Sequence, residues 1–350
     1  MKAMVLHAIN NFTLDDIEKP VPKGDQLLLK VAACGICGSD IPRVYELGTR
    51  VYPVVIGHEF SGEVCEVGDE KNRGLIGKRG VVFPLIPCMK CDNCRTGNYA
   101  ECTNYNYLGS RCDGGFAEYC LIPSPWHLVQ SHNPNVSLED LSLVEPATVA
   151  QHAVRRGGVT ASSNVVIFGA GPIGIMAARW CKIFGAARVI LVDIVDEKIR
   201  FARERGLEII DSTKEDCAAR VHEMTDGRGA DIALEGTGTS NGLNTAVESL
   251  RAFGHISLFG NPHKDTTIKL ASHSNILRKE LEISGVWNSY YLDVPVNEWK
   301  FTVSMIDQGK LQVSDLISHR ASLKNVKKLF DQIHNHEITI CKAIYSAALN

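Results

Sequence analysis

The feature that most constrains the fold is an alternation of apolar strands and helical patterns that begins near residue 163. Residues 165–168 form a continuous apolar run, residues 173–184 have helical spacing, and a second apolar run follows at 189–192. Strands that are apolar throughout and separated by helices are typical of a doubly wound parallel sheet, which is buried on both faces. The alternation therefore predicts an α/β sheet domain over residues 153–287.

A glycine-rich turn joins the first of these strands to its helix. It reads Gly169-Ala170-Gly171-Pro172-Ile173-Gly174, the pattern G-x-G-x-x-G between a strand and a helix. The first glycine permits the tight turn, the second lets the backbone approach a pyrophosphate, and the third lets helix and strand pack closely. Asp193 ends the next strand, where a carboxylate binds ribose hydroxyls and repels a 2′-phosphate, and Lys198 lies one helical turn further on. These residues predict a site for NAD.

The residues before this alternation have a different character. Short β-prone runs such as Gln26–Ala33 and Gly62–Val67 predict a mostly β region. The length of 350 residues fits about two domains, and 45% hydrophobic with 22% charged residues excludes a disordered or fibrous chain. A net charge of −3 gives no basic surplus for nucleic acid or an anionic membrane. Because we find neither a spanning apolar run nor a signal-peptide pattern, we expect a cytoplasmic protein.

Four of the twelve cysteines lie in one short segment. Cys88, Cys91, Cys94 and Cys102 have the spacing C-x2-C-x2-C-x7-C. In a reducing compartment cysteines are free thiols, metal ligands or catalytic groups rather than disulfides. Four thiolates at this spacing fit a closed tetrahedral zinc site, with fortuitous thiols or an iron–sulfur cluster as the alternatives. A closed site has no open position, so we predict a structural zinc here.

A second set of residues offers mixed metal ligands. Cys37, His58 and Glu145 supply one sulfur, one nitrogen and one oxygen, and a catalytic zinc takes three protein ligands and leaves a fourth position open. Each residue is ordinary by itself, because a lone cysteine is usually a small core residue and a lone histidine usually has a structural role. From residue types alone, this constellation is one hypothesis beside those structural readings.

The order of these features resembles that of the zinc-dependent medium-chain dehydrogenases, the alcohol and polyol dehydrogenase family. The run Gly57-His58-Glu59-Phe60-Ser61-Gly62, followed by Gly68, is similar to the zinc signature G-H-E-x-x-G-x5-G. The resemblance implies a GroES-like catalytic domain, residues 1–152 and 288–350, that carries the structural-zinc lobe. It implies a Rossmann dinucleotide-binding domain at 153–287 and a homodimer or homotetramer.

The resemblance also implies two zinc ions per chain and NAD as cofactors. Cys37, His58 and Glu145 match the expected ligands of the catalytic zinc, and Glu59 is an alternative ligand or a neighbour of the ligands. Ser39 stands two residues after Cys37, so its hydroxyl is expected to bind the substrate oxygen and pass on the proton. Pro42 occupies the position of a relay histidine in many members, which leaves Glu59, ribose or water for the next proton transfer.

Three segments point to a substrate class within the family. Residues 37–43, 109–119 and 144–149 are similar to those of members that oxidise polyol phosphates. Arg43 and Arg111 are therefore candidates for binding a phosphate, with solvated arginines or a helix-capping role as the alternatives. Asn288 is the third candidate substrate residue. It stands where sorbitol dehydrogenases have the arginine of an Arg-Tyr pair, which makes free sorbitol a less expected substrate.

We therefore predict NAD-linked oxidation of a secondary hydroxyl on a polyol phosphate. The alternatives within the enzyme class are dehydrogenases of an unphosphorylated polyol such as sorbitol or L-iditol, of 2,3-butanediol or of threonine. From another class, the alternative is a non-catalytic sensor that binds zinc and a dinucleotide. An intact mixed-ligand site argues against the sensor, because a sensor needs no open position on its metal.

Overall fold

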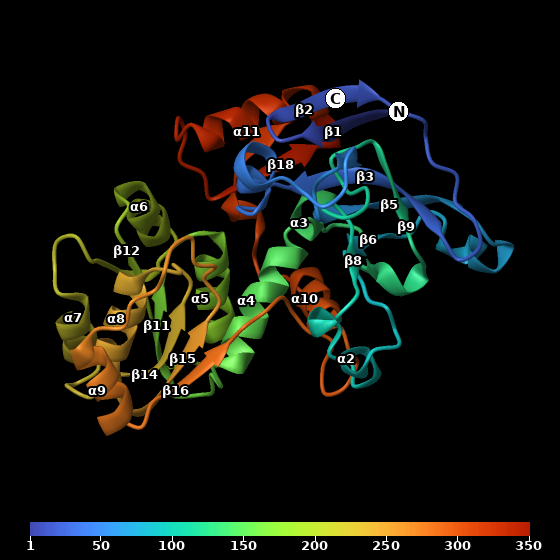
Figure 1. The fold of residues 1–350 in the computed structure, drawn as a ribbon. Coiled ribbons are helices and arrows are strands. Elements are labelled where there is room, and N and C mark those ends of the chain that lie inside the picture. The colour runs from blue at the N-terminus through green and yellow to red at the C-terminus, as the bar shows by residue number, and fades with distance from the viewer. The chain divides into compact units, whose positions relative to one another are not determined.

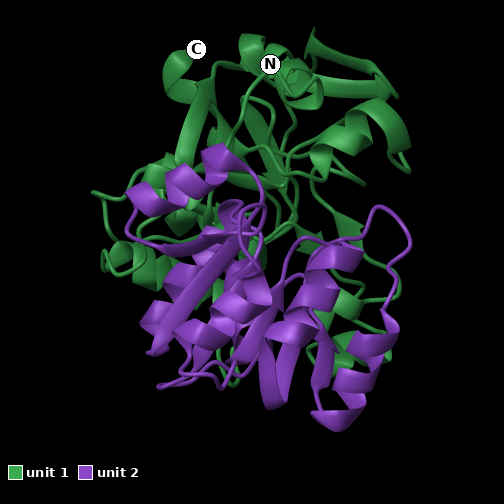
Figure 2. Cartoon of the chain, turned by 90° about the vertical axis from the view of Figure 1, so that its left-hand side faces the viewer, with its two compact units in different colours: residues 1–146, 290–350 green, residues 147–289 purple.

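The structure is a computed structural model that describes residues 1–350, and the chain divides into two compact units. Residues 1–146 and 290–350 form one unit, and residues 147–289 form the other (Figure 2). The division expected from the sequence falls after residue 152 and before residue 288. Helix α4 (Val144–Arg156) contains the first observed boundary. No helix has both the length and the apolar character that crossing a bilayer requires.

Residues 147–289 form a six-stranded parallel sheet in the order β13-β12-β11-β14-β15-β16, with helices on both sides (Figure 1). The strands are β11 (Asn164–Phe168), β12 (Arg188–Asp193), β13 (Glu208–Asp211), β14 (Ala230–Glu235), β15 (Leu250–Leu258) and β16 (Glu282–Gly285). The helices are α5 (Pro172–Ile183), α6 (Asp196–Glu204), α7 (Cys217–Met224), α8 (Ser240–Ser249) and α9 (Leu270–Arg278).

The centre of this sheet follows from its apolar strands. Val166 on β11 lies opposite Ile190 on β12 and Ala233 on β14, and all three residues are fully buried. A strand that is buried on both faces has no room for an alternating polar face, which is why residues 165–168 are apolar without interruption. The doubly wound parallel sheet predicted from the sequence is confirmed.

The other unit is rich in β-structure. Its main sheet has the order β10-β6-β5-β3-β18-β17, with β9 also paired to β3, and the smaller sheets are β2-β1-β4 and β7-β8. The strands are β1 (Lys2–Ala8), β2 (Asn11–Asp16), β3 (Leu27–Gly35), β4 (Val54–Val55), β5 (Glu59–Val67), β6 (Arg79–Val82), β7 (Leu85–Ile86), β8 (Asn106–Tyr107), β9 (Tyr119–Ile122), β10 (Leu128–Gln130), β17 (Ile317–Ala321) and β18 (Lys342–Ser346).

Short helices connect these strands. The α-helices besides α4 are α1 (Asp40–Pro42), α2 (Asp92–Arg95), α3 (Leu138–Leu141), α10 (Glu298–Asp307) and α11 (Val326–His334), and a π-helix covers Arg43–Leu47. Turns of 3-10 helix lie at Glu70–Leu75, Tyr99–Glu101, Pro125–His127, Ser314–Leu316, Leu323–Asn325 and Ala347–Leu349.

The C-terminal segment completes the β-rich unit. Strand β18 pairs antiparallel with β3, with Tyr345 opposite Cys34, so the tail of the chain lies inside the main sheet (Figure 1). Phe330 of α11 is fully buried, with ring centroids 5.0 Å from Phe12 and 5.6 Å from Phe116. Burying one such side chain contributes roughly 1.5–3 kcal/mol, so these contacts stabilise the return of the tail.

Candidate functional site

The chain positions a thiol, an imidazole and a carboxylate at one end of the β3–β5 pair. Cys37 follows β3, while His58 immediately precedes β5 and Glu59 begins it, opposite Gly35. The ligand atoms of Cys37, His58 and Glu59 all lie within 4.8 Å of one another. Sulfur, nitrogen and oxygen donors this close together fit a single zinc ion with a remaining open position.

Two glycines leave room for this cluster. A Cβ on Gly35 would lie 2.0 Å from Oε2 of Glu59, so any side chain there would displace the carboxylate. Gly57 has φ +97° and precedes His58, and a Cβ there would also lie 2.6 Å from the Phe116 ring. Only glycine combines this backbone conformation with the close packing, which explains the glycine before the His-Glu pair.

Asp40 lies against the Nδ1 side of the His58 ring. This fully buried carboxylate lies 3.5 Å from Nδ1 of His58, accepts a hydrogen bond from the Cys37 backbone N–H at 3.1 Å, and pairs with Arg43. Burial raises the pKa of Asp40, but the charges of His58 and Arg43 and its hydrogen bonds hold the pKa below the ordinary value. A carboxylate on one ring nitrogen fixes the orientation of the imidazole and leaves the other nitrogen for a metal.

Lys342 is a site residue that sequence reasoning missed. It begins β18, is 3% exposed, pairs with Oε2 of Glu59 and donates to the Ile36 carbonyl at 3.0 Å. Burial is the largest single effect and lowers the pKa of Lys342, but the charges of Glu59 and Cys37 and the hydrogen bond to Glu59 together outweigh burial, so the pKa is raised. The available signal was a lysine at the start of an otherwise apolar strand, because a buried lysine needs an acidic partner.

Glu145 lies close to this cluster but outside its 4.8 Å set. It stands in the first turn of α4, and burial raises the pKa of this carboxyl to about 7. The Tyr107 hydroxyl lies 3.4 Å from Oε1 of Glu145, and the Tyr107 ring stands edge-on to His58 with centroids 5.7 Å apart. Of the predicted ligands, the structure thus groups Cys37 and His58 with the alternative carboxylate, Glu59.

The predicted substrate residues have varied surroundings. The exposed Ser39 donates a hydrogen bond to Sγ of Cys37 at 3.3 Å, beside the candidate metal position. Arg43 lies in the π-helix and pairs with Asp40, whereas the Arg111 guanidinium lies 3.8 Å from the centroid of the Tyr105 ring. Asn288 belongs to residues 147–289, where it has φ +56°.

The four-cysteine segment forms a second candidate metal centre. The sulfur of Cys91 lies 3.5 Å from that of Cys94 and 3.9 Å from that of Cys102, and Cys88 lies 3.9 Å from Cys94. These distances exclude disulfides and match the ~3.8 Å edge of a tetrahedron with zinc–sulfur bonds of about 2.3 Å. Backbone N–H groups of Cys94 and Thr103 lower the pKa of Cys91 to about 6, which favours the thiolate that binds metal.

The glycine-rich turn forms the centre of a third candidate site. Gly169 has φ +100°, and a Cβ on Gly174 would lie 1.9 Å from the Gly169 carbonyl. Asp193 accepts hydrogen bonds from the backbone N–H groups of Ala170 and Ile194, each at 2.7 Å, while Lys198 is half-buried on α6. A pocket of about 270 Å³ is lined by Gly169, Asp193, Ile194, Thr237, Thr239 and Asn241, among others.

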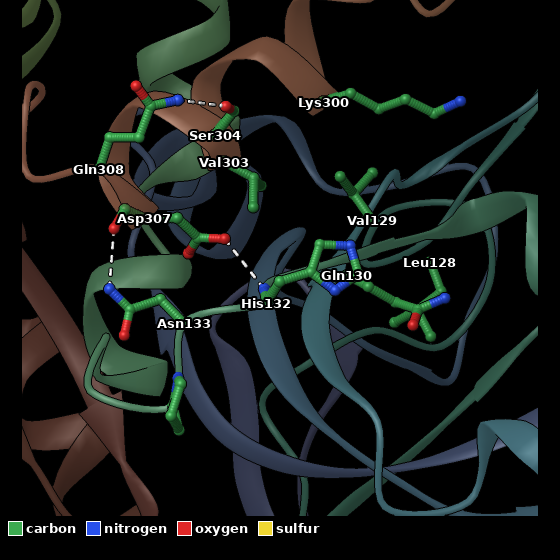
Figure 3. A pocket seen from close by; sticks show the side chains of 11 residues that line it. Leu128, Val129, Gln130, His132, Asn133, Lys300, Val303, Ser304, Asp307 and Gln308 are labelled. Atoms are coloured by element: carbon green, nitrogen blue, oxygen red, sulfur yellow. Dashed lines mark hydrogen bonds between the residues drawn. The ribbon is translucent and has the colours of Figure 1, made fainter.

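A larger pocket, of about 670 Å³, contains none of the predicted site residues. It lies between β10 and α10 (Figure 3). Asp307 occupies one side, where it accepts a hydrogen bond from the His132 backbone N–H at 2.9 Å, and its carbonyl accepts one from Asn133 at 2.8 Å (Figure 3). Because the Asp307 carboxylate is already bound by neighbouring groups, we assign no chemistry to this pocket.

Comparison with known families identifies the class of protein. Residues 23–133 match the alcohol dehydrogenase GroES-like domain, and residues 172–308 match the zinc-binding dehydrogenase domain. The chain belongs to the zinc-dependent medium-chain alcohol dehydrogenase family. It is therefore an oxidoreductase of a family that uses zinc and a nicotinamide dinucleotide.

Individual relatives extend over most of the chain. Galactitol 1-phosphate 5-dehydrogenase of Escherichia coli K12 is 33% identical over 302 residues, 86% of this chain and 87% of the relative. The crystal structure of the Escherichia coli galactitol-1-phosphate dehydrogenase superposes with a TM-score of 0.90 at 31% identity, covering 99% of this chain and 100% of that one.

Two further relatives differ in substrate or cofactor. Sorbitol dehydrogenase of Bacillus subtilis is 29% identical over 338 residues, 95% of this chain and 93% of the relative. A protein of Sinorhizobium meliloti 1021, described as a zinc-binding dehydrogenase and solved with bound NADP, has a TM-score of 0.90 at 27% identity, covering 99% of this chain and 98% of that one.

Proposed function

We propose that the chain oxidises a secondary hydroxyl of a polyol phosphate, of the galactitol 1-phosphate type, and transfers the hydride to NAD. The observation that carries the proposal is that the donor atoms of Cys37, His58 and Glu59 lie close together. The exposed Ser39 hydroxyl lies beside them. The likeness to galactitol 1-phosphate 5-dehydrogenase supports the substrate class. A zinc ion held by these groups would supply Lewis acidity that lowers the pKa of a substrate hydroxyl.

The residues around the donors have separate tasks. Asp40 orients His58, and Ser39 accepts the substrate proton and passes it on. Pro42 has no titratable group, so water, Glu59 or, with the dinucleotide bound, its ribose would take the proton from Ser39. Lys342 holds the Glu59 carboxylate in place. Ser39→Ala should lower turnover by about 10²–10⁴-fold, and an unchanged pH–rate profile would argue against the relay.

We assign NAD rather than NADP as the cofactor because of Asp193. Its carboxylate ends β12 at the pocket, where a 2′-phosphate would meet a negative charge. Steady-state kinetics with both dinucleotides test this assignment. We expect kcat/KM to favour NAD strongly, and Asp193→Ser to reduce that preference. Equal kcat/KM values in the parent protein would contradict it.

The phosphate assignment uses the two arginines. A guanidinium has five N–H donors, so its bond to Asp40 leaves Arg43 donors for a second anion. Kinetics on paired polyols with and without the phosphate ester test the assignment, with Arg43→Lys and Arg111→Met as variants. We expect the variants to lose efficiency mainly on the ester. An equal loss on both members of a pair would contradict the phosphate role.

An unphosphorylated polyol, 2,3-butanediol or threonine is the second candidate substrate. It is favoured by the engagement of both arginines, Arg43 with Asp40 and Arg111 with the Tyr105 ring, and by the likeness to sorbitol dehydrogenase. A non-catalytic sensor is the remaining candidate. Near-ultraviolet absorbance on a panel of polyols separates them, because only an enzyme produces NADH.

We also infer a homodimer or homotetramer. Strand β16 pairs only with β15, so it leaves one edge of the six-stranded sheet open. Ile283 on this strand is 40% exposed and Trp287 just after it is 61% exposed. An open edge with apolar side chains supports pairing with a second copy. Light scattering of Ile283→Lys should show smaller particles than the parent protein.

A further inference from the structure

A buried carboxylate at the end of β14 has no part in the steps above. Glu235 ends β14, next to β11 in the six-stranded sheet, and is 2% exposed. Its Oε1 accepts hydrogen bonds from the Thr237 backbone N–H, at 2.8 Å, and from the Thr237 hydroxyl, and its Oε2 accepts one from the Gly238 N–H at 3.1 Å. All three donors are neutral groups of one turn, so the carboxylate fixes the path of that turn.

The turn is built closely around this carboxylate. A Cβ on Gly242 would lie 2.5 Å from Oε1 of Glu235, and a Cβ on Gly236 would lie 2.3 Å from the Phe259 ring. Gly238 has φ +63°, a conformation that glycine adopts without strain. The backbone therefore approaches Glu235 and Phe259 too closely for a side chain at Gly236 or Gly242.

The same turn continues into helix α8. The Thr237 hydroxyl lies 2.9 Å from that of Thr239, and Oγ1 of Thr239 accepts a hydrogen bond from the Gly242 N–H at 3.0 Å. Thr239 is thus the N-cap of α8. A chain of polar contacts runs from Glu235 through Thr237 to the first turn of the helix.

The other side of this turn faces the pocket of about 270 Å³. Thr237 and Thr239 line that pocket together with Asp193 and Gly169. Asp193 is the residue expected to bind the ribose of the adenosine half of a dinucleotide. We propose that Glu235 is a positioning residue for the cofactor. It holds residues 237–239, which form one wall of the pocket, against the adenosine half. The inference rests on the proposed NAD-linked function, because it takes this pocket as the cofactor's.

Glu235→Gln is the primary test. The amide keeps the size of the side chain but turns an NH₂ group toward one of the N–H donors, so the turn loses at least one hydrogen bond. We expect the Kd of NADH, measured by its fluorescence, to rise about five- to tenfold. The Kd of ADP-ribose should rise by the same factor, because the wall faces the half that both ligands share. The KM for NAD should rise while kcat at saturating NAD stays within about twofold.

Asp231→Asn is the matched control. Asp231 stands near the other end of β14, accepts a hydrogen bond from the Asn164 N–H at 2.6 Å, and does not line the pocket. The Asp231→Asn variant should leave the Kd of NADH and the Kd of ADP-ribose unchanged. Thr237→Val should reproduce the weaker binding and Thr237→Ser should restore it. These two variants also keep the inference testable if Glu235→Gln fails to fold.

The outcomes separate the inference from the function on which it rests. If the parent protein binds NADH and ADP-ribose and Glu235→Gln and Thr237→Val bind both equally well, the inference is overturned. If those variants unfold at a lower temperature with unchanged dissociation constants, Glu235 has only a structural role. If the parent protein binds neither ligand, the proposed cofactor is wrong, and the inference fails with it.

Discussion

The two candidate metal centres of the β-rich unit are assembled in different ways. The four-cysteine centre takes all its donors from one loop between β7 and β8. The mixed centre takes its donors from the end of β3 and the start of β5, with Lys342 of β18 beside them. The first can therefore form from a local segment, whereas the second exists only when three distant strands are paired.

The two centres also differ in the number of charged groups that are buried around them. Around the half-buried Cys37, the residues Asp40, His58, Glu59 and Lys342 are all at least 94% buried, whereas the donors of the local centre are four thiols, two of them buried and two half-buried. Buried charges cost free energy unless each has a partner, so the mixed centre depends on its ion pairs. We therefore expect that removing a metal donor from the local centre mainly lowers stability, while removing a metal donor from the mixed centre mainly lowers turnover.

The largest expected effect is that of Cys37→Ala. Removal of one donor should lower turnover by more than about 10³-fold, because Lewis acidity contributes several kcal/mol to the reaction. Bound zinc should fall from two ions to one per chain, measured by atomic absorption, while the far-ultraviolet spectrum stays that of a folded chain. Cys65→Ala, a half-buried thiol on β5, is the control and should keep both ions. Full turnover in Cys37→Ala would break the distinction between the centres.

Lys342→Met tests whether the buried ion pairs stabilise the mixed centre. The change leaves Glu59 buried without its cation, which should cost about 3–5 kcal/mol of unfolding free energy in urea. The double variant Lys342→Met with Glu59→Gln should recover most of that loss, because both charges are then gone. A single variant as stable as the parent protein would mean that the pair contributes nothing.

Cys91→Ser tests the local centre. We expect one zinc ion to be lost and the thermal midpoint to fall, because a structural zinc site contributes folding free energy. Trp126 reports the change, since its ring lies 5.4 Å from that of Tyr99 in the cysteine loop, and its fluorescence should shift. Turnover per remaining folded chain should stay within about threefold of the parent value. Unchanged zinc content would exclude the four-cysteine site.

The sequence predicted most of the fold because its signals are local. Continuous apolar strands, the glycine-rich turn at residues 169–174 and the Gly-His-Glu run each lie within a few residues, and each needs only neighbouring residues to be recognised. The pairing of the cysteine sulfurs at 3.5–3.9 Å likewise follows from short spacings. Their roles as zinc ligands stay a prediction.

The remaining features of the site depend on strand pairing. Lys342 contacts Glu59 only because β18 pairs with β3. The pattern of apolar residues in either segment does not predict that contact. The same holds for Asp40, whose contact with His58 joins two separate segments. The surroundings of Arg43 and Arg111 depend on side-chain packing, which sequence spacing does not determine. Their role in phosphate binding stays a prediction.

The smallest expected effect is a pH dependence beside the cysteine loop. His127 is 4% exposed, its ring centroid lies 4.9 Å from that of Trp126, and burial lowers its pKa from 6.5 to about 4. The unfolded chain therefore takes up a proton at a higher pH than the folded one. The stabilisation is complete above pH 6.5 and is lost as the pH falls toward 4, by at most about 3 kcal/mol.

His127→Leu should remove this dependence. The difference in unfolding free energy between pH 7.5 and pH 5, measured in urea, should be smaller in the variant than in the parent protein, since leucine has no proton to bind. The exposed His132 gives a matched control, because His132→Gln should leave the difference unchanged. Acid release of zinc affects all three proteins alike, so the comparison isolates His127. Equal pH dependence in His127→Leu and the parent protein would show that protonation of His127 does not contribute to the loss of stability in acid.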